Sequence, residues 1–410
     1  MPQRRVVITG QGVITPLGLT IEEFWQGLIN GKSGIGPITR FDATNFSVKV
    51  AAEVKGFEPA DYMELKLADR TARFTQFAIA ASRIAVESAR LDFSREPKER
   101  VGITIASCID IQGISRELEV LKNRGPKRVN PLFISKIGPH MSAAQVGLMF
   151  GVKGPNSSVN TACASGAEAL ATAFDHIQLG HADVMIAGGA ESAISALPIA
   201  GLSCVGALSR EANPAKACRP FDLNRDGFVY GEGAGVVVLE SYEHATGRGA
   251  PILAELGGAG RSFDAYNETA PNPETQAMAM NTALRYAGIS PDEIDYINAH
   301  GTSTKLNDAT ETKAIKAVFG SHAYKIPVSS NKSMIGHIIV AAGAIEAIAS
   351  VLTINSGIIP PTINYETLDP ECDLDYVPNV ARQVKVDTCI TNSFGMGGQN
   401  CSLLLKRFTG

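Results

Sequence analysis

The strongest constraint on the fold is an alternation of short, continuously apolar runs with longer stretches of helical spacing. The apolar runs predict β-strands at Val101–Ala106, Val184–Ala187, Val236–Glu240, Ile294–Ile297 and Ile326–Ser329. Apolar residues recur with helical spacing in Phe74–Ala89, Ala167–Leu179 and Ala341–Asn355. Strands that are apolar throughout suit the centre of a sheet that is covered on both faces. The alternation therefore predicts an α/β protein built from layered sheets and helices.

Two stretches of the chain show the same order of features. Val159–Gly180 predicts a strand, a turn that carries Cys163, and a small-residue helix. Val328–Gly357 predicts a strand, a turn that carries His337, and another small-residue helix. Two similar halves that face each other would bring Cys163 and His337 to one central site. We place the division between the halves at residue 250, which gives the ranges 1–250 and 251–410.

Composition argues against several classes of protein. The net charge is −4, from 37 basic and 41 acidic residues, so no overall field favours nucleic acid. The seven cysteines are odd in number and form no CxxC spacing, which is typical of a reduced cytosolic chain rather than a disulfide framework or a zinc site. We find no stretch of eighteen apolar residues, and so expect no membrane span.

Cys163 stands where a predicted strand ends and a predicted helix begins. The positive end of a helix dipole lowers the pKa of a thiol and raises its thiolate fraction. The small residues Ala162, Ala164 and Gly166 leave room for a substrate beside the sulfur. The backbone N–H of Cys163 can point at a developing oxyanion. The alternative is a buried cysteine acting as a small apolar residue; the flanking residues favour the nucleophile.

Two histidines occupy positions where α/β proteins build sites. His300 ends a predicted strand and is followed by Thr302 and Thr304, whose hydroxyls could bind an amide or phosphate-bearing arm. His337 closes a turn that also carries Lys332. The alternatives are a core histidine bonded to backbone, a helix cap and a surface cation. The remaining histidines lack such contexts and are interpreted as structural or surface residues: His140, His176, His181, His244 and His322.

The run Thr391–Asn400 places three glycines around Met396. This pattern predicts a loop whose backbone approaches a ligand. The alternative is an ordinary turn between two strands. The run does not match GxGxxG and the chain has no P-loop, so nucleotide binding is not expected.

In this order, these elements resemble the β-ketoacyl-acyl-carrier-protein synthases, most of all the type II form of fatty-acid synthesis. The resemblance covers essentially the whole chain. It is carried by the runs Val7–Gly12, Thr161–Gly166, Ala187–Glu191, Arg219–Asp222, Arg225–Phe228, Gly231–Gly235, Asn298–Thr304, Asn331–His337 and Asn392–Asn400. It implies a thiolase-like α/β fold, in which two similar halves form a layered α-β-α-β-α architecture, usually as a homodimer.

The resemblance also implies a reaction. Cys163 accepts an acyl chain from the phosphopantetheine of an acyl carrier protein. His300 and His337 then assist loss of CO₂ from malonyl-carrier protein, and the carbanion attacks the Cys163 thioester to extend the chain by two carbons. Lys332 orients the histidines and keeps the site positive. The backbone N–H groups of Cys163 and Met396 bind the oxyanion.

Further expectations follow from the same resemblance. Thr302, Thr304, Phe394 and Met396 are expected to contact the substrate. Asp308 and Glu311 are assigned to local ion-pair structure. No metal or organic cofactor of the protein is expected, because phosphopantetheine arrives on the carrier protein. The partners are the acyl and malonyl forms of that carrier and a second copy of the chain.

Several positions depart from the family pattern. Met396 stands where phenylalanine usually gates the acyl pocket, and Gln399 where threonine is common. The stretch Ile105–Gly113 replaces a glycine-rich turn, and its Asp110 is expected to be solvated or to cap a helix. The loop Asp264–Thr269 carries Asn-Glu where His-Met is frequent. We hypothesise that these departures retune the substrate.

Docking of an acidic carrier protein is expected to use local cations. The candidates are Lys66, Arg70, Arg73, Arg124, Lys127, Arg128 and Arg210. For any single one of them, a solvated surface charge is an equally good interpretation.

Four alternative functions stay open. One is a ketosynthase of a polyketide or specialised-lipid pathway that works with a chain-length-determining partner. A non-catalytic partner subunit usually lacks the nucleophile, so Cys163, His300 and His337 argue against it. A thiolase tends to use a second cysteine and one histidine, whereas two histidines with Lys332 favour decarboxylation. A cysteine hydrolase is disfavoured because no carboxylate is placed to orient a single histidine.

Overall fold

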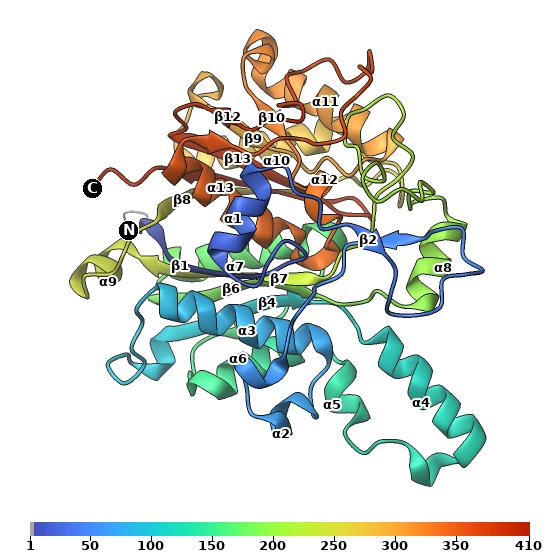
Figure 1. Ribbon diagram of the computed structural model, residues 1–410. Helices are drawn as coiled ribbons and strands as arrows, with labels where there is room; N and C mark the ends of the chain where they lie inside the picture. Colours follow the sequence, from blue (N-terminus) through green and yellow to red (C-terminus); the bar gives the residue numbers. More distant parts are fainter. Residues whose placement is uncertain (1–3) are drawn as a thin grey trace.

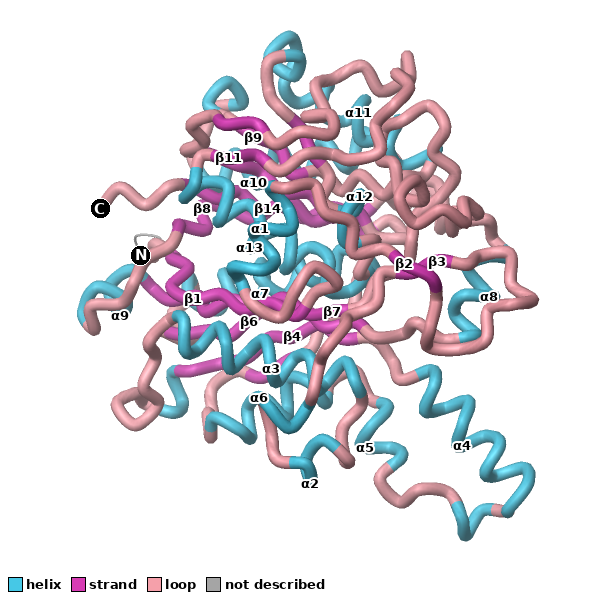
Figure 2. The backbone as a smooth tube through the Cα atoms, in the orientation of Figure 1, coloured by secondary structure: helices cyan, strands magenta, loops and turns pink. Residues whose placement is uncertain are grey.

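The computed structural model describes residues 4–410, and within them ten strands form one mixed sheet (Figures 1 and 2). Its strand order is β10-β9-β13-β14-β8-β1-β7-β6-β4-β5. The strands are β1 Val6–Ile14, β4 Val101–Ser107, β5 Asn156–Ser157, β6 Val184–Glu191, β7 Gly233–Ser241, β8 Ala254–Phe263, β9 Tyr296–Asn298, β10 Val328–Ser329, β13 Thr388–Phe394 and β14 Gln399–Lys406. Two short pairs stand apart: β2 Gly36–Pro37 with β3 Val50–Ala51, and β11 Ile358–Ile359 with β12 Arg382–Gln383.

The sheet consists of two five-stranded halves with the same topology. In the first half, β4 is parallel to β5 and β6, and β7 is antiparallel to β6 and β1. In the second half, β9 is parallel to β10 and β13, and β14 is antiparallel to β13 and β8. Only Val6–Ile8 of β1 and Ala254–Leu256 of β8 join them. The two similar halves expected from the sequence are therefore present; the boundary at residue 250 stays a prediction.

Helices fill the space outside and between the two halves (Figure 1). They are α1 Ile21–Ile29, α2 Leu65–Ala68, α3 Arg73–Ser88, α4 Ile111–Arg124, α5 Phe133–Ile137, α6 Met141–Phe150, α7 Ser165–Gln178, α8 Ala196–Cys204, α9 Tyr242–Gly247, α10 Pro273–Ala287, α11 Lys305–Phe319, α12 Lys332–Ile335 and α13 Ala342–Ser356. On β7, Val236 and Val238 pack in the core beneath α3, and Val237 and Leu239 pack in the core around α7. Helices α10 and α11 cover the other half, so the layers run α-β-α-β-α.

The central layer depends on two glycines. Helices α7 and α13 cross where Gly166 faces Gly343. A Cβ atom on Gly166 would lie 2.8 Å from the backbone nitrogen of Ala344, and one on Gly343 would lie 2.7 Å from that of Ala167. Both distances are too short for a side chain, so glycine is required for the backbones to approach this closely. This crossing brings the two repeats together.

The expected elements are present, with shifts at their ends. The repeat unit that was expected to begin with a strand at Val159 begins instead with β5, which ends at Ser157. The strand expected from Ile294 starts at Tyr296, because a 3₁₀ turn over Pro291–Glu293 with a capping box occupies the preceding residues. Asp110 caps α4 by accepting the N–H of Gly113 at 2.9 Å, which confirms the capping alternative.

One helix bears on the expectation of no membrane span, which stays a prediction. The segment Ile339–Ser356 is long and apolar enough to cross a membrane by length and composition alone. It contains α13, the helix packed between the two halves of the sheet, and 78% of it is buried in the protein. A helix that is apolar all round is what a central layer needs, so burial between two sheets accounts for its composition.

Candidate functional site

The turn that carries Cys163 is held in a strained conformation. Cys163 lies in a 3₁₀ turn, η4 (Ala162–Ala164), directly before α7. Ala162 has a φ of +49°, in the left-handed region that costs an alanine free energy. The buried Ser165 hydroxyl fixes the turn, because it accepts the N–H of Thr161 at 2.8 Å and donates to the carbonyl of Ala162 at 2.6 Å. The thiol is thereby presented at the start of the central helix.

Three side chains that were expected to act together converge here. The sulfur of Cys163 and ring nitrogens of His300 and His337 all lie within 4.8 Å of one another. Both histidines are buried, and their ring centroids are 5.4 Å apart in an edge-to-face arrangement. Phe394 packs edge-to-face on His300 at 5.7 Å, and Phe228 does the same on His337 at 5.1 Å. The aromatic rings therefore fix the direction of each imidazole.

The turn after β9 holds His300 through its backbone. The carboxylate of Glu311 accepts the N–H groups of His300 and Gly301, both at 2.8 Å. Gly301 has a φ of +40°, and a Cβ there would lie 2.6 Å from that of Ser330. Asp308 is 3.6 Å from Arg225, in the ion pair that was expected. The ion-pair assignment of Glu311 is wrong, because its partners are backbone N–H groups and burial raises its pKa to about 7.

Lys332 lies against His300 in a fully buried position. Its ammonium group donates to the carbonyl of His300 at 2.7 Å, forms an ion pair with the equally buried Glu346, and lies 3.5 Å from Nδ1 of His300. Burial raises the pKa of Glu346 to about 7, although the Lys332 charge opposes that rise. The pair fixes the lysine beside the imidazole. The Lys332 charge also acts to lower the pKa of Cys163, His300 and His337, so its role in keeping the site positive stays a prediction, with Glu346 beside it as a counter-charge.

Both histidines are neutral near pH 7. Burial, then the Lys332 charge, holds the pKa of His300 and that of His337 well below the usual range. A lysine ammonium has only protons to offer, so the nearby Nδ1 of His300 is the natural acceptor and Nε2 carries the ring proton. Neither ring nitrogen of His337 has a hydrogen-bond partner within residues 4–410. Both rings therefore have a nitrogen available to a ligand.

The thiol of Cys163 is protonated at rest, contrary to the sequence-based expectation. Burial raises its pKa to about 11, and this outweighs the lowering by Lys332 and by nearby backbone N–H groups. A helix end acts over one turn and is worth roughly 1 kcal/mol, which is less than the cost of burying a thiolate. A nucleophilic role thus needs a base that takes the proton during attack.

Two backbone N–H groups point at the sulfur of Cys163. They belong to Cys163 itself and to Met396, in the loop between β13 and β14. Gly395 lets this loop touch the cysteine turn, since a Cβ there would lie 2.4 Å from the carbonyl oxygen of Thr161. The Met396 side chain is 52% exposed, so only its backbone is committed to the site. This pair of donors has the arrangement of an oxyanion hole.

The two expected substrate threonines are adjacent. The hydroxyls of Thr302 and Thr304 share a hydrogen bond of 2.9 Å, and Thr304 also caps α11 by accepting the N–H of Asn307. Thr302 is buried and Thr304 is half-buried. They follow His300 directly, on the same turn.

Sequence reasoning missed several residues around the site. Glu346 has a visible signal, as the only charged residue of α13, but its partner is remote in sequence. Glu191, at the end of β6, is buried, accepts the N–H of Ala193 at 2.9 Å and bonds to the side chains of Cys108 and Tyr230. Burial raises the pKa of Glu191 to about 7, and its charge would raise that of Cys163. No local pattern marks this cluster.

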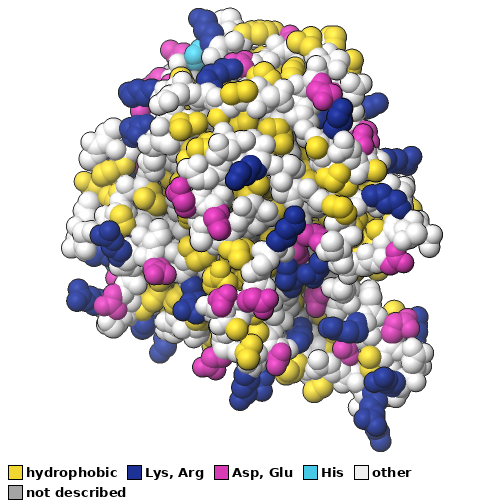
Figure 3. All heavy atoms as spheres, in the orientation of Figure 1, with side chains coloured by type: hydrophobic (Ala, Val, Ile, Leu, Met, Phe, Trp, Pro, Cys, Tyr) yellow, Lys and Arg dark blue, Asp and Glu magenta, His cyan; other side chains and the backbone are white. Residues whose placement is uncertain are grey.

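Six of the seven predicted docking cations have exposed side chains, and none of the six has an ion pair within the described chain: Lys66, Arg70, Arg124, Lys127, Arg128 and Arg210. Arg73 is the exception and a correction. It forms a 2.9 Å ion pair with the buried Glu232 and lies 4.5 Å from the centre of the Phe77 ring. Its charge is therefore already paired within the protein and is not free for carrier docking. Figure 3 shows cations gathered over the projecting α4–α5 segment.

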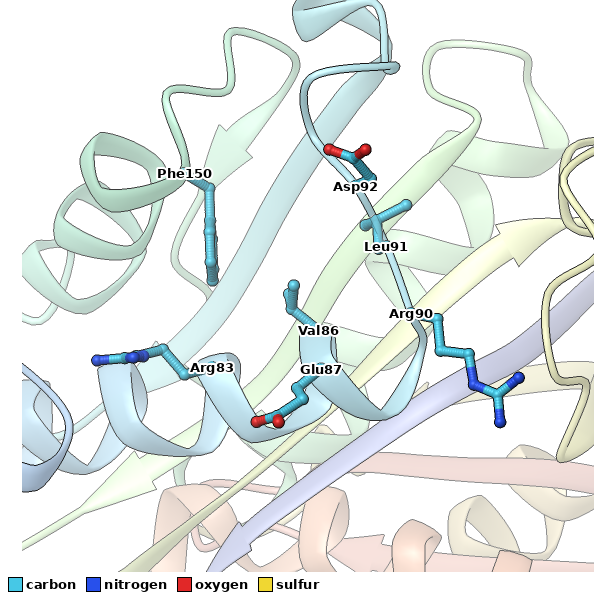
Figure 4. Close-up of a pocket in the computed structure, with 7 residues that line it drawn as sticks. All are labelled: Arg83, Val86, Glu87, Arg90, Leu91, Asp92 and Phe150. Carbon is cyan, nitrogen blue, oxygen red and sulfur yellow. The ribbon is translucent and has the colours of Figure 1, made fainter.

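Two hollows lie outside the cysteine site. One, of about 410 Å³, opens on α3 and is lined by Arg83, Glu87, Arg90 and Phe150 among others (Figure 4). Helix α3 covers the face of the sheet opposite to α7, so this hollow is separated from Cys163 by the sheet. The other, of about 290 Å³, lies between the starts of α3 and α4 and includes the cations Arg116 and Lys136, which sequence analysis did not single out.

Comparisons with known proteins agree over nearly the whole chain. Residues 3–245 match the family "Beta-ketoacyl synthase, N-terminal domain", and residues 253–366 match "Beta-ketoacyl synthase, C-terminal domain". The chain is 48% identical to the 3-oxoacyl-(acyl-carrier-protein) synthase 2 of Coxiella burnetii, over 99% of each chain. It is 45% identical to the protein of the same name from a Synechocystis species, over 100% of this chain and 99% of that one.

Solved structures show the same fold. One is a type II polyketide acyl-carrier protein in complex with its ketosynthase, matched with a TM-score of 0.92 and 37% identity. Another is the ishigamide ketosynthase/chain length factor, with a TM-score of 0.93 and 39% identity. Each match covers 99% of this chain and 100% of the other. Because both family domains and full-length relatives match, the chain belongs to the β-ketoacyl synthase family.

Proposed function

We propose that this chain is a decarboxylating β-ketoacyl-acyl-carrier-protein synthase that lengthens acyl chains by two carbons in fatty-acid synthesis. The observation that carries the proposal is the buried convergence of Cys163, His300 and His337 beside two backbone N–H groups aimed at the sulfur. A thiol, two neutral imidazoles and an oxyanion hole are the groups that acyl transfer followed by decarboxylative condensation requires. The full-length relatives named 3-oxoacyl-(acyl-carrier-protein) synthase 2 support the same activity.

The first step is transfer of the acyl group to Cys163. The sulfur attacks the carbonyl carbon of an acyl thioester while its proton passes to a neutral imidazole, which is needed because the pKa of the thiol is about 11. The N–H groups of Cys163 and Met396 hold the tetrahedral oxyanion. The C–S bond to the carrier then breaks, and its thiolate takes the proton. His337 is the better base, since its ring nitrogens have no other partner in the described chain.

The second step is decarboxylation of the malonyl thioester. Nε2–H of His300 donates to the thioester oxygen, and a ring N–H of His337 donates beside it. The bond to the carboxylate breaks, CO₂ leaves, and its electron pair forms an enolate that the two N–H groups stabilise. The enolate carbon attacks the Cys163 thioester and displaces the sulfur. Neutral imidazoles suit this role, and their pKa values below the usual range keep them neutral.

A condensation assay tests the proposal. Octanoyl-carrier protein and malonyl-carrier protein are mixed with the enzyme, and the products are identified by mass. The wild type should form a β-ketoacyl-carrier protein with two more carbons. Substituting either catalytic histidine by alanine should lower the rate by about 10²–10³-fold, the typical cost of one oxyanion donor. His140→Ala, an exposed control, should retain the rate. Equal loss in the control, or no product from the wild type with several primers, contradicts the proposal.

We further propose that the partners are an acyl carrier protein and a second copy of the chain. The exposed cations of α2, α4 and the turn that follows it support carrier docking. Reversing the charges of Lys127 and Arg128 together should raise the KM for carrier protein and weaken the salt dependence of that KM. If neither quantity changes, these two residues are not part of the docking surface.

For the dimer, β5 is an edge strand, and Ile109, Leu121 and Ile134 are exposed on and beside the projecting α4–α5 segment. Light scattering at micromolar concentration decides between monomer and dimer.

We also propose a cytoplasmic location and a reaction without a resident cofactor. All seven cysteines are unpaired thiols, which supports a reducing, cytoplasmic location. The reaction takes its phosphopantetheine from the carrier protein and uses no resident organic cofactor in this scheme.

A second candidate function is a polyketide or specialised-lipid ketosynthase that needs a chain-length-determining partner. The match to a type II polyketide ketosynthase and to a ketosynthase/chain length factor favours it. The greater identity to the fatty-acid relatives, 45–48% against 37–39%, favours the first candidate. Full activity of the purified homodimer would exclude the need for a partner.

A further inference from the structure

The cysteine site has the donor set of a zinc site. A thiolate sulfur and two imidazole nitrogens are ligands that Zn²⁺ prefers, and three protein ligands with one open position are the usual arrangement of an accessible zinc site. The sulfur of Cys163 and the ring nitrogens of His300 and His337 lie within 4.8 Å of one another. We propose that these three side chains form an inhibitory binding site for a thiophilic divalent cation, with Zn²⁺ as its ligand.

The fit requires only small movements. Zn–S bonds are about 2.3 Å and Zn–N bonds about 2.0–2.1 Å, so tetrahedral ligand atoms lie about 3.5 Å apart. The ligand atoms of the three side chains lie within 4.8 Å of one another, so movements of about 1 Å toward a common centre bring them to that spacing. Cys163 lies in η4 directly before α7, His300 on the turn after β9, and His337 between α12 and the 3₁₀ turn Ile339–Ala341 that leads into α13.

His337 provides an independent indication of a ligand. It is 1% exposed, and neither of its ring nitrogens has a hydrogen-bond partner in the described chain. A buried polar group without a partner costs free energy, and a bound group that accepts its lone pair recovers that cost. Phe228 packs edge-to-face on the ring and keeps it aimed at Cys163 and His300.

The positive charge of Lys332 opposes binding of a cation. Coordination through Nε2 of His300 moves the ring proton to Nδ1, which lies 3.5 Å from the ammonium group. That contact is longer than an ordinary hydrogen bond, and Lys332 keeps two better acceptors in the His300 carbonyl and Glu346. The tautomer change therefore costs little free energy, and the Glu346 carboxylate offsets the lysine charge.

Binding would block the reaction proposed above. The S–H bond of Cys163 breaks and its proton passes to solvent, the sulfur donates an electron pair to Zn²⁺, and no other covalent bond of the protein breaks. The metal then occupies the lone pair with which Cys163 would attack a thioester. A cysteine that already carries an acyl group has no thiolate to offer, so prior acylation should protect the enzyme. The inhibition, unlike the binding, rests on the proposed function.

The test is zinc binding to chelator-treated enzyme, measured by competition with a chromogenic chelator, together with iodoacetamide labelling of Cys163 read by peptide mass. Zinc at about ten times its Kd should slow labelling of Cys163 by about tenfold, and Mg²⁺ should not. Cys163→Ala and His337→Ala should each weaken the tight site by about 100-fold or more, since even residues that only orient a ligand contribute 10–100-fold.

Two control variants address zinc at other places. Cys204 is an exposed thiol, and the half-buried His176 and the exposed His181 have Nδ1 atoms 3.3 Å apart. Cys204→Ser and His176→Ala should keep the tight site. Equal zinc binding by the wild type and both site variants, or equal protection by Mg²⁺, overturns the inference. Zinc protection in an enzyme that performs no condensation would uphold the metal site and refute the proposed function, so the two failures are distinguishable.

Discussion

Removal of one charge from the buried pair of Lys332 and Glu346 should strongly destabilise the protein. Both side chains are fully buried, and the ammonium group also anchors the carbonyl of His300. In Glu346→Gln the lysine keeps its desolvation cost but loses the opposite charge. Breaking a buried ion pair in this way costs about 3–5 kcal/mol. The cost is this large because a single buried charge without a partner is far less favourable than a buried pair of opposite charges.

A control and a double variant make this prediction specific. The pair of Lys313 and Glu371 is 3.4 Å long, and its side chains are 60% and 63% exposed. Glu371→Gln should therefore change the free energy of unfolding by less than about 1 kcal/mol. Replacing both members of the buried pair, with Lys332→Met added to Glu346→Gln, should recover much of the loss, because two neutral side chains of similar size need no desolvated charge.

Urea unfolding followed by fluorescence and circular dichroism gives the free energies. A free energy of unfolding for Glu346→Gln within about 1 kcal/mol of the wild type would contradict this prediction, as would a double variant that loses more than the sum of the single losses.

Three further predictions concern other parts of the molecule. Gly166→Ala should lower stability by more than about 2 kcal/mol through overpacking at the helix crossing, whereas Gly201→Ala in α8, where a Cβ meets nothing within 4 Å, should be neutral or stabilising in the same denaturation assay. The pKa of His244 is raised, first by its hydrogen bond to the Glu240 carboxylate, so its contribution is fully present below pH 6.5 and is lost as pH rises through the folded pKa. Between pH 6 and 9 the free energy of unfolding of the wild type should thus fall by up to about 2 kcal/mol more than that of His244→Ala. Parallel profiles of unfolding free energy against pH for the two proteins would contradict this. Met396→Phe should shift the preferred acyl length, because a rigid ring replaces an exposed flexible side chain; identical product profiles would remove the gating hypothesis.

Much of the fold was predictable because its signals are local. Continuous apolar runs marked β4, β6 and β7, and small-residue helices marked α7 and α13. The equal order of strand, turn and helix around Cys163 and His337 indicated two similar halves. The ends of strands were less predictable, because a capping box and a 3₁₀ turn over Pro291–Glu293 decide where β9 begins.

The site was predictable in its residues and less so in its electrostatics. Cys163, His300 and His337 converge, but the pKa of the thiol rises because burial outweighs the helix end. Burial depends on the packing of whole layers, which a local pattern does not contain. For the same reason, only the structure revealed Glu346 as the partner of Lys332 and the buried Glu232 as the partner of Arg73.

Covalent capture of the acyl chain by Cys163 is the step on which the proposed reaction depends most directly. Intact-protein mass spectrometry after incubation with octanoyl-carrier protein alone should show one octanoyl adduct, absent in Cys163→Ala and present in Cys204→Ser. Addition of malonyl-carrier protein should discharge that adduct into a β-ketoacyl product two carbons longer. An adduct that persists in Cys163→Ala, or an octanoyl enzyme that malonyl-carrier protein does not discharge, would contradict the account.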